Sequence, residues 1–140
     1  MNDAALIIFR KSFDCCMASP VFFDLFYDHF LKSSPEVGEK FRHTDFARQK
    51  GALKASLHLI ADAIVLDSSD LSRSRNLLQM QEVAQRHSRS QANIPPHLYI
   101  LWLDSLLFAV KETDRNLDAE VEAAWRMGMQ SGINYILSFY

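Results

Sequence analysis

Three polar side chains interrupt faces of the chain that are otherwise apolar: Tyr27, Gln49 and His87. Tyr27 lies among phenylalanines, Gln49 shares a helical face with leucines and isoleucines, and His87 follows Met80 and Val83 at helical spacing. The phenol and the amide are hydrogen-bond donors, and such bonds are stronger in a dry pocket than in water. Each residue alone has an ordinary explanation, as a core histidine with a partner, a tyrosine whose hydroxyl reaches water, or a glutamine at a boundary. Taken together, they point to something more specific.

Long helices must position these side chains, because the composition and the spacing of helix-capping residues both favour an all-α chain. The 140 residues contain only four glycines and four prolines, about half the usual share of these turn formers. Capping residues or prolines precede each periodic segment, at Ser19-Pro20, Ser34-Pro35, Thr44-Asp45, Ser68-Ser69-Asp70, Asn93 to Pro96 and Asn116 to Asp118. The predicted helices span residues 4–18, 20–33, 35–41, 45–65, 70–88, 95–113 and 117–138, in one domain that covers residues 1–140.

The overall composition excludes several classes of protein. Hydrophobic residues make up 49% of the chain and charged residues 23%, which is typical of a globular protein. The net charge of −2 leaves no basic excess to hold a nucleic-acid backbone. The two cysteines, Cys15 and Cys16, are adjacent and make a poor structural disulfide, which indicates a reducing compartment. We find no signal peptide and no apolar run long enough for a membrane span, so a cytoplasmic protein without a membrane partner is expected.

Several short motifs follow one another along the chain: FYDHFL at 26–31, SPEV at 34–37, Phe41, TDFARQ at 44–49, VAQRH at 83–87, Tyr99, and VEAAW at 121–125. In order and spacing, these motifs resemble those of bacterial single-domain globins, the myoglobin-like or flavohaemoglobin-type globin domain. The resemblance covers nearly the whole chain. It implies an all-α globin fold in which about seven helices form a three-over-three sandwich around haem.

The resemblance also implies roles for individual positions. His87 matches the proximal histidine, which makes the protein's one bond to the iron of haem b, iron protoporphyrin IX. Covalent attachment of the haem is not expected, because the chain has no Cys-x-x-Cys-His motif. Tyr27, Gln49 and Leu53 match the three distal positions over the iron. Further contacts with the haem are expected from Phe41, Val83, Ile94 and Tyr99.

A tyrosine and a glutamine on the distal side have a physical reason of their own. Dioxygen on the iron carries partial negative charge on its outer atom, so a phenol O–H and an amide N–H aimed at it stabilise the complex. A bond of ~1–2 kcal/mol slows the escape of dioxygen roughly 5–30-fold, whereas carbon monoxide, which is less polar when bound, gains little. Leu53 would supply an apolar lid that excludes water and delays oxidation of the iron.

Two segments depart from the globin pattern. The stretch between the proximal histidine and Tyr99 is slightly longer than in flavohaemoglobin-like globins. Within or beside it, Arg86 and Arg89 are equal candidates for pairing with a haem propionate or for solvated surface charges. Flavohaemoglobins also place a glutamate late in the last helix, against the proximal histidine. This chain has Phe139 and Tyr140 at about that position, so we expect little peroxidase activity.

Three of the other histidines are expected at the surface or at its boundary. They are His43, His58 and His97. His43, in the loop after Phe41, is the one that could swing toward the iron. An internal ligand of this kind would occupy the oxygen site and change the coordination of the iron.

The favoured function is a haem globin that binds dioxygen reversibly. It would oxidise nitric oxide to nitrate with electrons from a separate reductase, because 140 residues leave no room for a flavin reductase. One alternative is a gas sensor, able to bind carbon monoxide or nitric oxide, that acts through a separate output protein. Another is a partner-binding globin module that has lost haem, which is disfavoured because the proximal and distal residues are all present. The sequence leaves monomer and dimer open.

Overall fold

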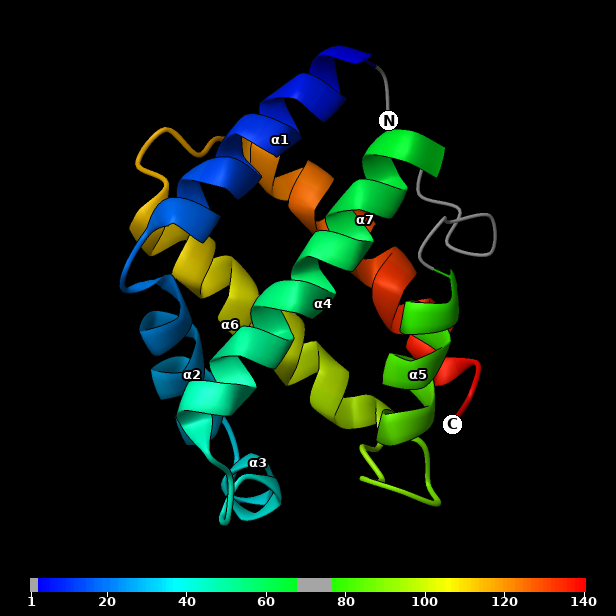
Figure 1. The fold of residues 1–140 in the computed structure, drawn as a ribbon. Helices are drawn as coiled ribbons and strands as arrows, with labels where there is room; N and C mark the ends of the chain where they lie inside the picture. Colours follow the sequence, from blue (N-terminus) through cyan, green and yellow to red (C-terminus); the bar gives the residue numbers. More distant parts are fainter. Residues whose placement is uncertain (1–2, 68–76) are drawn as a thin grey trace.

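The computed structural model describes residues 3–67 and 77–140. These residues form seven α-helices and, within the described part, no strand. The helices are α1 (Asp3–Ala18), α2 (Phe22–Lys32), α3 (Pro35–Lys40), α4 (Phe46–Asp67), α5 (Leu77–His87), α6 (Pro96–Thr113) and α7 (Ala119–Leu137). Figure 1 shows α4 crossing in front of α6 and α7, with α2 and α3 on one side of the molecule and α5 on the other. The predicted all-α class is confirmed.

Two of the predicted helix starts have the expected caps. Ser34 Oγ accepts a hydrogen bond from the Glu36 N–H at 3.1 Å, and Pro35 occupies the first turn of α3, where its missing N–H costs nothing. At α7, Asp118 Oδ1 accepts from the Val121 N–H at 2.9 Å. Both caps satisfy backbone donors that would otherwise have no partner at a helix start.

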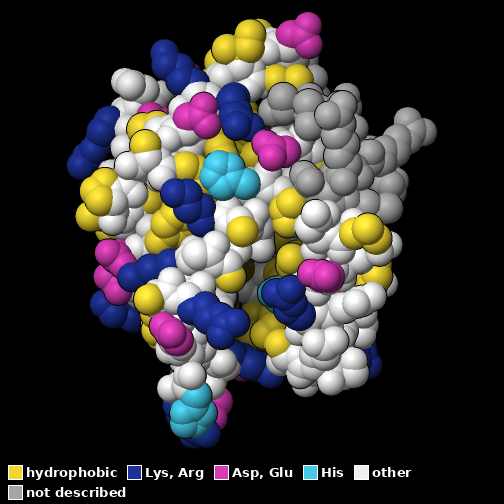
Figure 2. All heavy atoms as spheres, in the orientation of Figure 1, with side chains coloured by type: hydrophobic (Ala, Val, Ile, Leu, Met, Phe, Trp, Pro, Cys, Tyr) yellow, Lys and Arg dark blue, Asp and Glu magenta, His cyan; other side chains and the backbone are white. Residues whose placement is uncertain are grey.

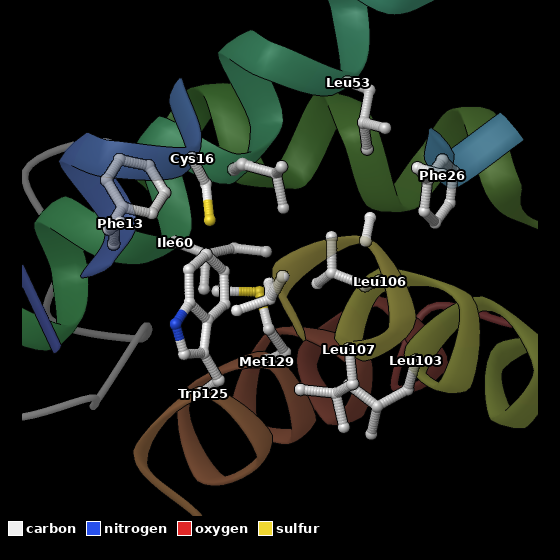
Figure 3. Close-up of a cluster of buried hydrophobic side chains, with 14 of the residues drawn as sticks. Phe13, Cys16, Phe26, Leu53, Ile60, Leu103, Leu106, Leu107, Trp125 and Met129 are labelled. Atoms are coloured by element: carbon white, nitrogen blue, oxygen red, sulfur yellow. The ribbon is translucent and has the colours of Figure 1, made fainter. Parts of the chain in front are cut away.

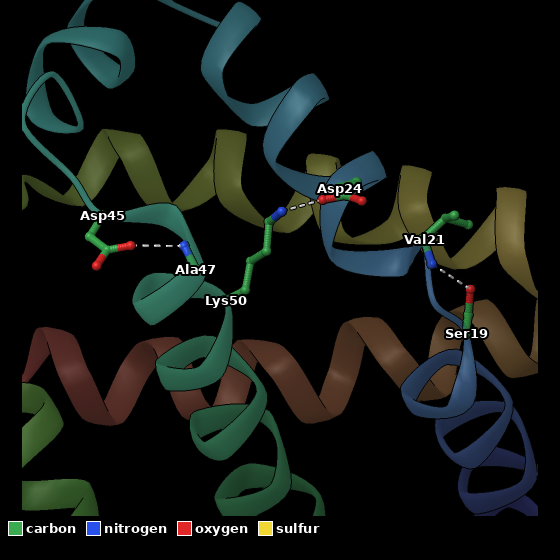
Figure 4. Close-up of polar contacts among 6 residues, drawn as sticks. All are labelled: Ser19, Val21, Asp24, Asp45, Ala47 and Lys50. Carbon is green, nitrogen blue, oxygen red and sulfur yellow. Dashed lines mark hydrogen bonds and ion pairs between the residues drawn. The ribbon is translucent and has the colours of Figure 1, made fainter.

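Two other starts differ from the prediction in their details. Helix α2 begins at Phe22 instead of residue 20, with Val21 at its N-cap position. Ser19 Oγ still accepts from the Val21 N–H at 3.2 Å (Figure 4), but this bond lies in the turn before the helix. At α4 the capping side chain is Asp45, whose Oδ1 accepts from the Ala47 N–H at 3.1 Å. The start predicted at residue 70, with its capping segment, lies outside the described residues.

Helix α4 is also tied to α2 by an ion pair between the Lys50 ammonium and the Asp24 carboxylate (Figure 4). Exposed pairs of this kind contribute little to stability on average. This one nevertheless joins the two helices that carry Gln49 and Tyr27.

The core between α1 and α7 is built around Trp125, which is fully buried. Its ring meets that of Phe9 edge-on at 5.2 Å between centroids, and its indole N–H donates to Ser12 Oγ at 2.9 Å. Figure 3 shows Trp125 beside Met129 and Phe13 at one end of the buried cluster. The hydrogen bond joins helices at opposite ends of the sequence and gives the buried indole the acceptor that it needs.

Within residues 3–67 and 77–140, we find no helix with the length and apolarity that a membrane span requires.

Candidate functional site

The candidate site is a largely apolar cavity of about 360 Å³ whose walls come from both halves of the chain. Helices α2, α4, α5 and α6 contribute most of the lining, and the ends of α3 and α7 complete it. All eight residues that the sequence singled out border this one cavity. They are Tyr27, Phe41, Gln49, Leu53, Val83, His87, Ile94 and Tyr99.

His87, at the last residue of α5, has one ring nitrogen engaged and one free for a ligand. Its Nδ1 lies 2.7 Å from the Val83 carbonyl oxygen, which can only accept, so Nδ1 carries the proton and donates. In the neutral ring, Nε2 then keeps its lone pair. Burial lowers the pKa of His87 and the nearby Arg86 charge lowers it further, while the bond to Val83 opposes both. The site therefore favours a neutral imidazole, the form that binds a metal ion.

Tyr27, on α2, brings a hydroxyl group into an aromatic wall. The residue is 4% exposed, and its ring meets those of Phe26 and Phe46 edge-on, at 4.8 and 5.4 Å between centroids. Burial raises the pKa of Tyr27 to about 12, and a hydrogen bond with the Gln49 side chain lowers it in part. The Tyr27 hydroxyl therefore keeps its proton at neutral pH.

The wall beside Tyr27 is completed by Phe41 and Leu53. Phe41 ends α3, and its ring lies 6.0 Å from that of Tyr27 and 5.8 Å from that of Phe30. Leu53, on α4, is 7% exposed and lies one helical turn after Gln49. An apolar wall of this kind excludes water from the two donors and strengthens the bonds that they can make.

The only charged side chains in the described lining are cations, Lys40 on α3 and Arg86 on α5. Lys40 Nζ donates to the Ala92 carbonyl at 3.4 Å, and the Ala92 N–H donates to the Arg86 carbonyl at 2.9 Å, so a single residue links the two elements. Figure 2 shows hydrophobic side chains inside a hollow with Lys and Arg side chains beside it. Of the two arginines that the sequence left open, Arg86 borders the cavity. Arg89 instead lies over the Tyr140 ring, at 4.4 Å.

The loop after His87 is held by hydrogen bonds that keep its far end at the cavity. The Ile94 N–H donates to the His87 carbonyl at 3.1 Å, and Asn93 adopts a left-handed conformation with φ of 51°. Asparagine tolerates this conformation better than most residues. The Tyr140 hydroxyl donates to Asn93 Oδ1 at 2.9 Å. The extra length of this segment is therefore taken up in an ordered loop, and Ile94 and Tyr99 still reach the lining.

The three histidines expected at the surface or its boundary lie away from the cavity lining. His43 is exposed, and His97 is exposed and has its Nε2 2.6 Å from Glu36 Oε1. His58 is half-buried, with its ring 5.0 Å from that of Phe13. These positions agree with the expected surface or boundary locations.

Sequence reasoning did not assign several lining residues to the site. The larger apolar members among them are Phe26, Phe30, Val37, Leu57, Ile60, Leu98, Trp102, Ile133 and Ile136. Several share a helical face with an assigned residue, as Leu57 and Ile60 do with Leu53, but periodicity alone does not separate a core face from a cavity wall. Lys40 has no signal in the sequence beyond its position next to Phe41.

Comparisons with known proteins point to one family. The family model for globins matches residues 24–134. A crystal structure from Pseudomonas aeruginosa PAO1, described as highly homologous in structure to a human haemoglobin, is 40% identical in sequence, with a TM-score of 0.85. The match covers 97% of this chain and 98% of that one. A comparison with curated protein sequences finds no match.

Proposed function

Because the chain belongs to the globin family, which implies a haem cofactor, we propose that it holds haem b through His87 and binds dioxygen reversibly. The observation that carries this proposal is the state of His87. Its imidazole is held by the Val83 carbonyl and is kept neutral by burial. It borders a largely apolar cavity, and no other residue of the described lining is a histidine. A neutral imidazole with one free nitrogen is the ligand that globins provide to haem iron. The single domain expected from the sequence, residues 1–140, is part of the same proposal.

The charges of the lining also fit haem b, which has an apolar ring system and two carboxylates at one edge. The cavity wall is largely apolar, and its two charged residues, Lys40 and Arg86, are both cations on neighbouring elements. Charge-assisted hydrogen bonds from such groups to carboxylates are about twice as strong as neutral ones. Lys40 and Arg86 would therefore hold the propionates, while Phe41, Val83, Ile94 and Tyr99 would pack against the ring.

The distal residues supply selectivity between gases. When bound, haem supplies an iron that takes up a diatomic ligand. The Tyr27 hydroxyl and the Gln49 amide both border the cavity and would be able to donate to that ligand. Leu53 keeps water from both groups. This arrangement favours a polar ligand such as dioxygen over carbon monoxide.

We further propose that slow release of dioxygen lets nitric oxide react with it to form nitrate. The reaction takes one electron for each nitrate formed from one nitric oxide and one dioxygen. A separate reductase would have to supply that electron. No carboxylate faces His87 among its described partners, so its imidazole stays neutral and peroxidase activity is expected to be low.

Absorption spectra of the purified protein, reduced with and without carbon monoxide, test the haem proposal. We expect one haem b per chain and a spectral change on addition of carbon monoxide. His87→Ala should lose this spectrum, whereas the control His43→Ala, at an exposed position, should keep it. A full complement of haem with an unchanged ferrous spectrum in His87→Ala would refute the assignment.

Stopped-flow mixing with nitric oxide tests the second proposal. Single conversion to nitrate is expected without a reductase, and repeated turnover only when a reductase and its electron donor are added. Repeated turnover without any added reductant would contradict the need for a separate partner.

A further inference from the structure

The far end of the cavity is bordered by Ile60, whose position depends on the opposite helix. Leu53, Leu57 and Ile60 lie on one face of α4 and all border the cavity. With a rise of about 1.5 Å per residue, Ile60 lies roughly 10 Å beyond Leu53 along the helix axis. In Figure 3, Ile60 lies toward Trp125 and Met129, whereas Leu53 lies at the other side of the cluster.

Helix α7 passes Ile60 at Gly132, where an added side chain would displace that of Ile60. A Cβ atom at Gly132 would lie 2.7 Å from Ile60 Cδ1 and 3.1 Å from its Cγ1. Distances under 3.0 Å essentially never occur between a real Cβ and its neighbours, so Ile60 would have to move. Ile60 is 4% exposed and has the cavity on one side, so the open space beside it is the cavity itself. Closely packed interiors leave few other places for a displaced methyl group.

We propose that Gly132 determines the depth of the cavity, and hence the size of the molecule it accepts, by allowing Ile60 to pack against α7. The glycine acts as a positioning residue through Ile60 and does not touch the bound molecule. The inference rests on the proposed function in taking haem as the molecule that fills the cavity.

Gly128 provides a matched control one helical turn earlier. A Cβ atom there would lie 2.3 Å from Ile64 Cδ1, an even closer approach. Ile64 is 1% exposed, but it does not border the cavity. Gly128→Ala should therefore strain the same pair of helices without narrowing the cavity, whereas Gly132→Ala should do both.

The rate of hemin loss distinguishes the two substitutions. It is measured by transfer of hemin to an excess of an acceptor apoprotein, with thermal unfolding of each variant followed in parallel. Both variants should unfold at lower temperature, because overpacking destabilises a core. Only Gly132→Ala should raise the rate of hemin loss, by roughly fivefold or more. Adding Ile60→Val, which removes Cδ1, should return the rate toward that of the Ile60→Val protein alone.

Binding of anilinonaphthalene sulfonate to the apoprotein gives a second reading that does not need haem. Its affinity should fall in Gly132→Ala and stay near the original value in Gly128→Ala. If the original protein binds this probe but no haem, the proposed function fails and the inference about cavity depth is still tested. Ile60→Phe adds bulk at the same place without a change in α7. It should lower the affinity for the probe in the same way. Equal effects of the two glycine substitutions, or no effect of Ile60→Phe, would overturn the inference.

Discussion

Replacing Tyr27 by phenylalanine removes one hydroxyl group and leaves the aromatic wall intact. The ring of Tyr27 is 4% exposed and is fixed by edge-on contacts with Phe26 and Phe46, which a phenylalanine can also make. The substitution therefore changes hydrogen bonding far more than shape. The lost bond lies in a largely apolar cavity at a buried residue, so its contribution should be at the upper end of the ordinary range, ~1–2 kcal/mol.

In the haem-loaded, reduced protein, this loss should raise the dioxygen dissociation rate of Tyr27→Phe by roughly 5–30-fold. Carbon monoxide dissociation should change much less. The hydrogen bond between Gln49 and Tyr27 adds a further expectation. Gln49→Leu should also speed dioxygen release, but the double variant should fall short of the product of the two single effects, since the residues act as one network.

The assay is stopped-flow displacement of dioxygen by excess carbon monoxide, with the reverse displacement as the control. Equal acceleration for both gases would show that Tyr27 controls access by its bulk, and the hydrogen-bond argument would be refuted. Multiplicative effects of the two substitutions would show that Tyr27 and Gln49 act independently, which contradicts their contact in the structure.

Three further predictions follow from single contacts. Ser12→Ala leaves the buried N–H of Trp125 without an acceptor and should lower the free energy of unfolding by about 1–3 kcal/mol, measured in urea. Arg86→Glu should speed hemin loss, whereas Arg89→Glu, outside the lining, should not; equal rates would remove Arg86 from the propionate site. The pKa of Tyr27 is about 12 in the folded protein against 10 in the unfolded chain, so the folded protein binds this proton more tightly. The resulting contribution to the free energy of unfolding is present below pH 10 and is lost as the pH rises toward 12. Apoprotein unfolding across this range should show a smaller loss of stability in Tyr27→Phe.

Much of the fold could be predicted because its signals are local. The Ser34-Pro35 start of α3 depends on two adjacent residues, and the structure has the cap that they predict. The Ser19-Pro20 start was wrong by two residues, although Ser19 Oγ makes the same bond to the N–H two residues later that caps α3 at Ser34. Such alternatives have nearly the same sequence pattern and are decided by packing around the turn.

The candidate site was predicted less completely, because its parts differ in how they show in sequence. His87 and Gln49 stand out as polar residues on apolar faces, and both border the cavity. Ile60 and Ile133 carry no such contrast, and only the crossing of α4 and α7 brings them to the cavity wall. The choice between Arg86 and Arg89 likewise depended on the path of the loop after α5, which no local pattern specifies.

The cavity wall has a consequence for how the protein accumulates in a cell. Phe26 on α2 and Ile136 on α7 border the same space, so no partly folded chain in which either helix is missing can complete the cavity. A molecule that binds only the complete cavity shifts the folding equilibrium by mass action, by about 4 kcal/mol when its concentration is roughly a thousand times its dissociation constant. The supply of that molecule then sets how much of the chain survives unfolding and proteolysis. A substitution far from the cavity can lower occupancy through the same equilibrium, without touching any residue of the wall.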